Sequence, residues 1–156
     1  MVQIQKITTT GEALNHAIKL FEEYANELNE NLCFQSFDTE LQNPLNKYGV
    51  EAKGALLICY VHEKPVGCVA LQNLGNNVCE MKRLYVQPTY RQQKIGNFLV
   101  QQILIEAQLL GFATMKLDTL VRLQAAIELY KKFSFEETTA YYQNPLPEVV
   151  YMEKRL

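Results

Sequence analysis

The stretch Glu80–Leu110, EMKRLYVQPTYRQQKIGNFLVQQILIEAQLL, decides how this chain folds. Its first part is rich in strand-forming residues and ends at Val86, where Gln87-Pro88 interrupts it. A polar, basic loop from Arg91 to Gly96 then opens directly into a long amphipathic segment with helical spacing. The first amides of a helix have no partners inside the helix, so a strand, a polar loop and a helix N-terminus together favour anion binding. We therefore expect a phosphorylated ligand at this loop.

Length and composition indicate one ordinary globular domain. The chain has 156 residues, of which 48% are hydrophobic and 21% charged, and we expect a single domain over residues 1–156. The net charge of −2 gives no basic field, so nucleic acid is not an expected partner. No apolar run reaches membrane-spanning length, and the opening MVQIQKITTT lacks the apolar core of a signal peptide. We expect no membrane partner and a cytoplasmic location.

The residue types that bind metals are scattered along the chain. The four cysteines show no C-x-x-C pairing, and three of them lie in apolar runs, so reduced and buried thiols are expected there. The two histidines, His16 and His62, lie far apart in sequence and have no ligand-type neighbours. We therefore expect no metal site.

Helical periodicity marks three long segments: Glu12–Leu28, Ile95–Leu110 and Ala125–Phe133. Thr9 and Glu12 have the spacing of a capping box at the start of the first helix. Asp38 is placed to cap a short helix that ends at Pro44. The inward face of the second long helix is expected to include Phe98, and Gly111 is placed to end that helix.

Seven segments have the composition of strands: Val2–Ile7, Ala55–Val61, Val66–Leu71, Val78–Val86, Thr114–Leu117, Phe135–Tyr141 and Val149–Lys154. Strands that come first in hairpins and later alternate with helices predict an α/β fold of mixed α+β type. Its sheet is expected to be mixed and twisted, with helices on both faces.

The strand Val78–Val86 contains a change of apolar phase. Cys79 and Met81 occupy one parity, whereas Leu84 and Val86 occupy the other. A strand with a period of two either is buried on both faces or carries an extra residue. We favour the second interpretation, a β-bulge near Lys82-Arg83.

The loop Arg91–Asn97 alone does not establish a ligand site. Its amides and its basic side chains could cradle a pyrophosphate, but a solvated loop that merely begins a helix is equally compatible with the pattern. The loop carries a single glycine, and it matches neither the P-loop pattern nor the G-x-G-x-x-G pattern of dinucleotide folds.

Several patches together resemble the GNAT superfamily of N-acetyltransferases. The loop fits the family's acyl-CoA motif, [RQ]-x-x-G-x-[GA], at Arg91 and Gly96, and it departs at Lys94, where the family usually has glycine. The preceding segment Met81–Arg91 is similar to the family's strand and turn. The family's usual ending, LDT … A-x-x-LY-x-x-x-GF, is matched at Leu117-Asp118-Thr119, Ala126, Leu129-Tyr130 and Phe135, with Ser134 in place of the glycine.

The resemblance implies a sheet splayed by the bulge and acetyl-CoA as co-substrate, without a metal. By resemblance, backbone groups of Leu84, Tyr85 and Val86 would hold the pantetheine arm. The pyrophosphate would lie on the loop formed by Arg91, Gln92, Gln93, Lys94, Ile95, Gly96 and Asn97. If the loop needs a positive φ at Lys94, lysine there costs roughly 1–2 kcal/mol, which its charge could offset.

Two residues are implied as catalytic. Tyr130 stands where family members often have a general acid that protonates the departing CoA thiolate. The alternative is a core tyrosine beside Leu129. Glu80 stands where the family commonly has a base that takes a proton from the acceptor amine, directly or through water. The alternative is a surface glutamate paired with Lys82 or Arg83.

The acceptor site is the least defined part of the sequence. Two aromatic groups, which are Phe34 with Phe37 and Tyr141 with Tyr142, either line the acceptor pocket or pack in the core. Asp38 and Glu40 would suit a cationic amine, and Asp118 is either an acid near the cleft or a helix cap.

The resemblance thus implies an N-acetyltransferase that moves an acetyl group to a primary amine of a small molecule or peptide, by direct transfer in a ternary complex. The alternative is a non-catalytic acyl-CoA-binding or sensor domain. A homodimer through the last strand is also open, since an unpaired edge can pair with a second copy.

Overall fold

The computed structural model describes residues 1–156, apart from the side chain of Phe34, which lies outside the described part together with the expectation placed on it. Seven strands form one sheet in the order β1-β2-β3-β4-β5-β7-β6. Their bounds are β1 Val2–Lys6, β2 Ala55–Val61, β3 Lys64–Gly75, β4 Val78–Val86, β5 Thr114–Leu120, β6 Glu136–Thr138 and β7 Val149–Arg155. Neighbouring strands are antiparallel except for β4 and β5, which are parallel. The predicted mixed sheet is confirmed.

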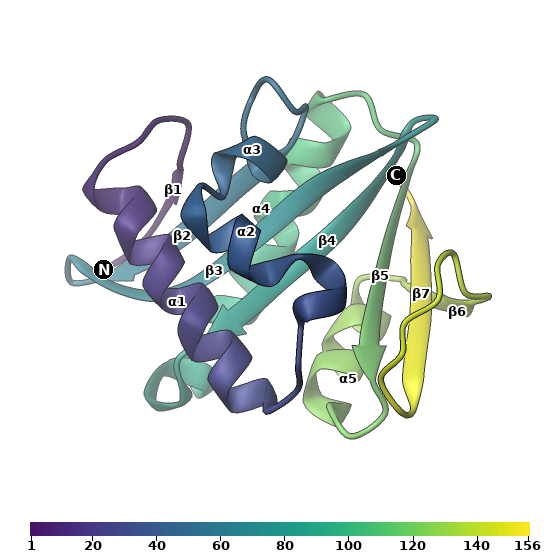
Figure 1. Cartoon of the computed structure of the whole chain (residues 1–156). Helices are drawn as coiled ribbons and strands as arrows, with labels where there is room; N and C mark the ends of the chain where they lie inside the picture. Colours follow the sequence, from purple (N-terminus) through teal and green to yellow (C-terminus); the bar gives the residue numbers. More distant parts are fainter.

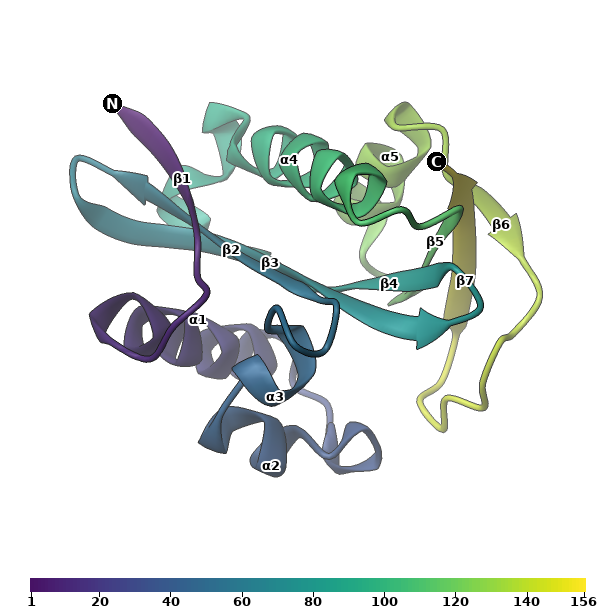
Figure 2. The same cartoon turned by 90° about the horizontal axis from the view of Figure 1, so that it is seen from above.

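Helices cover both faces of the sheet, as expected (Figure 2). One face carries α1 (Glu12–Leu28), α2 (Phe37–Gln42) and α3 (Leu45–Tyr48), and the other carries α4 (Ile95–Leu109) and α5 (Gln124–Lys132). Two short 3-10 helices connect these elements, η1 (Cys33–Gln35) before α2 and η2 (Pro88–Gln93) before α4.

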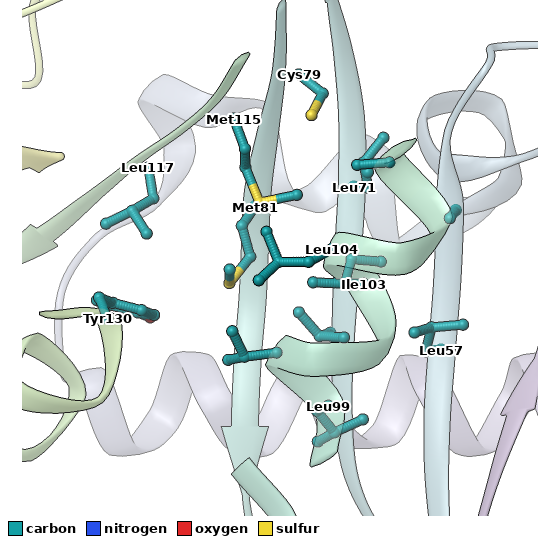
Figure 3. Close-up of a cluster of buried hydrophobic side chains, with 14 of the residues drawn as sticks. Leu57, Leu71, Cys79, Met81, Leu99, Ile103, Leu104, Met115, Leu117 and Tyr130 are labelled. Carbon is teal, nitrogen blue, oxygen red and sulfur yellow. The ribbon is translucent and has the colours of Figure 1, made fainter. Parts of the chain in front are cut away.

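Each face of the sheet has its own hydrophobic core. Leu57, Leu99, Ile103 and Met115 are among the fully buried side chains between the sheet and α4, and Figure 3 shows them pointing toward one another from β2, α4 and β5. The second core lies beneath α1 and includes fully buried Phe21. Two packed layers hold the central strands in place from both sides, so packing also fixes the path of β4.

The predicted bulge in β4 is confirmed. Cys68 of β3 pairs with Tyr85, and Ala70 pairs with Lys82, so two steps along β3 match three along β4. The extra residue is accommodated at Arg83, which has the left-handed φ of 60°. A bulge bends its strand and increases the local twist.

The bend separates β4 from β5. The two strands pair only where Val78–Glu80 meets Thr114–Lys116, and beyond that point they diverge toward α5 (Figure 1). The backbone of β4 from Leu84 onward therefore has no strand beside it on the β5 side. The splayed sheet that the resemblance implied is confirmed.

Several local predictions were wrong. No side chain caps α1, because the cap residue is Gly11 and Glu12 is the first helical residue instead of the third. Asp38 lies inside the first turn of α2, after the cap residue Ser36. Phe98 is 42% exposed, because the buried stripe of α4 repeats every fourth residue from Ile95.

Strand lengths also differ from the predicted ones. β3 continues to Gly75 and β5 to Leu120, whereas β6 stops at Thr138. The extensions follow from pairing: β3 pairs with β4 as far as Gly75, and β5 pairs with β7 as far as Leu120. Partner strands set these lengths, and partners are not visible in local composition. The end of α4 agrees with prediction, since Gly111 follows it with a φ of 85°.

Candidate active site

A cleft of about 90 Å³ lies where β4 parts from β5. Leu84 of β4, Thr119 of β5, and Ala126 and Tyr130 of α5 are among the residues that line it. The bulge and the parallel strand pair create this cleft, because the strands diverge while α5 closes one side. The position predicted for the general acid is thus brought to the centre of the splayed sheet.

Tyr130 both packs in the core and lines the cleft. Its ring packs edge-on against Phe135 at a centroid distance of 5.9 Å, and only 7% of the residue is exposed. It also lines the cleft. Burial raises the pKa of Tyr130 well above the ordinary range of a phenol, so the hydroxyl keeps its proton at neutral pH.

A larger groove of about 560 Å³ adjoins the cleft, and Leu84 and Ala126 line both. It runs between the end of β4, the start of α4 and α5. Six of the ten residues predicted to bind the cofactor line this groove: Leu84, Tyr85, Val86, Arg91, Gly96 and Asn97. Gln92, Gln93 and Lys94 are exposed beside it, whereas Ile95 is fully buried in the core.

The loop before α4 has a positive φ at Lys94, the position where the family usually has glycine. Lys94 has φ 60° and ψ 19°, and its carbonyl accepts the hydrogen bond of the Phe98 amide, at 3.1 Å. A non-glycine residue in this region costs on the order of 1–2 kcal/mol. Gly96 lies close to α5 for a different reason: a Cβ there would lie 3.3 Å from the Leu129 side chain, which would have to shift slightly. The amides of Gly96 and Asn97 belong to the first turn, which leaves them without partners in the helix.

Arg91 makes contacts within the protein that its sequence position did not indicate. Its guanidinium contacts both carboxylate oxygens of Glu27 on α1, at 2.5 and 2.6 Å, and its Nε donates to the carbonyl of Val86 at 2.9 Å. Arg91 therefore ties η2 to the end of β4 and to α1. About 43% of its side chain remains exposed at the groove.

Glu80 does not lie in the same cavity as Tyr130. It lines a second pocket of about 460 Å³, together with Lys116, Tyr141 and Tyr142. The residue is 4% exposed, and one carboxylate oxygen accepts a hydrogen bond of 2.5 Å from the Tyr141 hydroxyl. Lys82 Nζ lies 3.7 Å from the other oxygen. The ion pair with Lys82 that was weighed as an alternative is therefore present, whereas Glu80 has no ion pair with Arg83 among the described contacts.

The cleft and the second pocket meet at two side chains, Lys82 and Gln35, which line both. Lys82 Nζ donates to Gln35 Oε1 at 3.3 Å. Lys82 is 9% exposed, and burial lowers its pKa to about 8. The sequence carries a signal for this residue, because Lys82 shares the parity of Glu80 in β4, but the sequence predicted for it only the bulge and a pairing with Glu80.

Arg83 and Glu40 form a buried ion pair that anchors the bulge to α2. Arg83 donates from Nε and Nη2 to the two oxygens of Glu40, at 2.9 and 3.0 Å, and Lys47 adds a contact of 3.2 Å. Burial alone would raise the pKa of Glu40, but the hydrogen bonds and charges of Arg83 and Lys47 outweigh it and lower the pKa. Glu40 is therefore not available to a cationic acceptor, contrary to expectation. Phe37 packs beneath Arg83 as core, not as a pocket wall.

The loop between β6 and β7 completes the site. The Tyr142 hydroxyl donates to Asp118, whose Oδ2 also accepts a hydrogen bond of 2.7 Å from Asn144 Nδ2. Asp118 lines the cleft, and its role as a helix cap is not observed. Tyr141 and Tyr142 are pocket residues, as one of the two interpretations held. Asn144 was missed because nothing in a loop pattern reveals which strand the loop covers.

The described residues offer neither a metal site nor a membrane-spanning helix. In this part of the chain no three histidine, cysteine or acidic side chains come close enough to hold a metal ion. None of its helices has the length and apolarity needed to cross a membrane.

Comparisons with known proteins identify the family. Residues 17–135 match the acetyltransferase (GNAT) family. An uncharacterized N-acetyltransferase of Schizosaccharomyces pombe is 46% identical over 134 residues, which cover 85% of this chain and 82% of that protein. An acetyltransferase structure from Streptococcus agalactiae superposes with a TM-score of 0.83 at 20% identity, covering 99% of this chain and 98% of that one.

The PaiA N-acetyltransferase of Thermoplasma acidophilum, solved in complex with coenzyme A, has a TM-score of 0.72 at 19% identity, with 99% of each chain covered. These two structures agree with the fold described above, and the family match and the yeast relative cover most of the chain. The chain therefore belongs to the GNAT family of N-acetyltransferases and is an acyltransferase.

Proposed function

We propose that this enzyme transfers an acetyl group from acetyl-CoA to a primary amine of a small molecule or peptide, by direct attack in a ternary complex. One observation carries the proposal: the groove at the end of β4 runs into the cleft that Tyr130 lines, with Leu84 and Ala126 shared by both. A proton donor therefore lies where the groove ends.

One sheet that contains both β1 and β7 supports our further proposal that residues 1–156 act as one domain.

The groove has the features that acetyl-CoA requires. The backbone of β4 from Leu84 onward lacks a strand on the β5 side, so its polar groups can pair with an extended amide-containing chain. The unpaired amides of Gly96 and Asn97 suit a pyrophosphate at the helix N-terminus. The coenzyme A complex of the Thermoplasma protein supports this choice of ligand. Acetyl-CoA would supply a thioester that is activated toward attack by an amine.

The side chains would divide the proton transfers between them. Tyr130, kept protonated by burial, would donate its phenolic proton to the departing thiolate. Glu80 would accept the proton of the attacking amine, directly or through water, while the Tyr141 hydroxyl fixes its orientation. The pockets of the two residues meet at Lys82 and Gln35, so an amine at this junction that faces Glu80 would lie between base and acid.

The test is release of CoA thiol from acetyl-CoA in the presence of amine panels, for the wild-type enzyme, Glu80→Gln and the control Glu22→Gln. Glu22 is exposed on α1. We expect amine-dependent release, a loss of about 100-fold or more in kcat for Glu80→Gln, and no change for the control. Binding of acetyl-CoA without turnover of any amine would favour the sensor alternative and contradict the proposal.

A further inference from the structure

The second pocket, around Glu80, has a charge distribution that acetyl transfer alone does not explain. Glu80 of β4 and Lys116 of β5 are register partners in the last paired segment of the two strands. Both line the pocket, together with Lys47 and Lys82. The pocket lining thus contains three lysines and one acidic residue, in a protein whose net charge is −2. The excess of positive charge is local to this pocket.

The three lysines differ in how well their charge is matched. Lys47 lies 3.2 Å from Glu40, which neutralises much of its charge. Lys116 has a looser contact of 3.8 Å with Glu153, and its Nζ stands 5.4 Å from the centre of the Tyr141 ring. The Tyr141 hydroxyl in turn donates to Glu80. Lys116 over the ring of Tyr141 and Glu80 at its hydroxyl therefore bring opposite charges to this side chain.

Lys82 differs from the other two lysines in combining deep burial with a long ion pair. It is the most buried, yet its nearest carboxylate is 3.7 Å away and its hydrogen-bond acceptor is the neutral amide oxygen of Gln35. Glu80 is further engaged by Tyr141. A buried ammonium whose ion pair is long is costly, and the lowered pKa of Lys82 reflects this cost. A carboxylate brought by a ligand would supply the missing charge.

We propose that the acceptor is an amine that also carries a carboxylate, and that Lys82 and Lys116 bind this carboxylate while the amine faces Glu80. The inference rests on the proposed function. The pocket volume of about 460 Å³ is in the range of sites for small ligands. It fits an acceptor of amino-acid size. Polycationic acceptors are disfavoured, because Lys82 and Lys116 repel them and Glu40 is already paired with Arg83.

The first experiment compares matched acceptors. The proteinogenic amino acids, β-alanine and γ-aminobutyrate are each assayed beside the corresponding carboxamide, which keeps the amine and removes the negative charge. We expect kcat/KM for the best acid to exceed that of its carboxamide by about tenfold or more, the size of one charge-assisted hydrogen bond. Equal rates or a preference for carboxamides would overturn the inference and leave the acetyltransferase proposal standing.

The second experiment assigns the preference to residues. In Lys116→Met and in Lys82→Met we expect the ratio of kcat/KM for acid over carboxamide to fall by about tenfold. Lys131→Met, a change at an exposed lysine of α5, should leave the ratio unaltered. A ratio that is insensitive to both pocket lysines would also overturn the inference.

A binding measurement separates this inference from the proposed function. With coenzyme A present, calorimetry compares the N-acetyl derivatives of the same acids and carboxamides, which needs no turnover. Tighter binding of the acids by about tenfold, lost in Lys116→Met, would support the inference even if no acceptor were acetylated. Equal binding of acids and carboxamides, or no binding of either, would overturn it.

Discussion

Burial acts on two side chains of the cleft in opposite directions, because it always favours the neutral form. It raises the pKa of Tyr130, so the phenol stays protonated, and it lowers the pKa of Lys82 to about 8. At the residue scale the site therefore holds a proton donor that is ready to act and a cation whose charge is costly. Neither effect can be read from the residue types alone, because both depend on how deeply the sheet buries them.

Replacing Tyr130 by phenylalanine tests the proton donor. We expect kcat to fall by about 100-fold or more, the usual contribution of a general acid, while the Kd of acetyl-CoA changes by less than about twofold. Loss of the hydroxyl removes no groove contact, which explains the separation of the two effects. Steady-state kinetics and calorimetry provide the readouts, with Tyr60→Phe on β2 as control. An unchanged kcat would remove Tyr130 from the mechanism.

Replacing Lys82 by methionine tests the cost of the buried charge. Below pH 8 both folded and unfolded states hold the ammonium, so the full cost is present. Between about 8 and 10.5 the folded state releases its proton first, and wild-type stability rises with pH. The charged and polar groups that face Lys82 are Glu80, Arg83, Lys47, Asp118 and Gln35.

Lys82→Met lacks this titration. Its stability relative to wild type should therefore be greatest near pH 7 and decline by on the order of 3 kcal/mol as the pH rises through 8 to 10.5. Urea unfolding at several pH values measures this difference, and other titrations cancel because they occur in both proteins. A difference that does not depend on pH would contradict the account.

At the scale of elements, the bulge in β4 is the feature that makes the site. Its position followed from the change of apolar parity after Met81, and the structure places it at Arg83. The anchoring partner Glu40 could not be predicted, because it lies on α2 and no periodic pattern links the two positions. The buried pair fixes the bulge against the helix layer, and the splay of the sheet depends on that bulge.

A double-mutant cycle tests this anchor. Arg83→Met leaves the Glu40 carboxylate buried without its main partner, and we expect the free energy of unfolding to fall by about 3–5 kcal/mol. Adding Glu40→Met removes the stranded charge, so the double variant should be more stable than Arg83→Met alone. Denaturant unfolding provides the values. Additive losses in the double variant would show that the two side chains do not depend on each other.

For the whole molecule, composition and periodicity predicted the layers and the mixed sheet, and the motifs of the family resemblance implied the splay and most of the residues that line the groove. These features follow from local periodicity and from motifs close together in the chain. The links made by distant segments were missed. They include the ion pair between Arg91 and Glu27, the hydrogen bond from Asn144 to Asp118, and the placement of Glu80 and Tyr130 in two neighbouring pockets. Each depends on how a loop or α1 packs across the sheet, which local patterns do not encode.

The central claim is that β4, α4 and α5 form an acetyl-CoA site. Thermal unfolding with acetyl-CoA, CoA and ATP titrated separately tests it most directly. At 100 times its Kd a ligand adds about 2.7 kcal/mol of stability, which for a chain of this size raises Tm by roughly 5–10 °C. We predict this rise with acetyl-CoA and CoA but not with ATP. No rise at millimolar acetyl-CoA would contradict the claim.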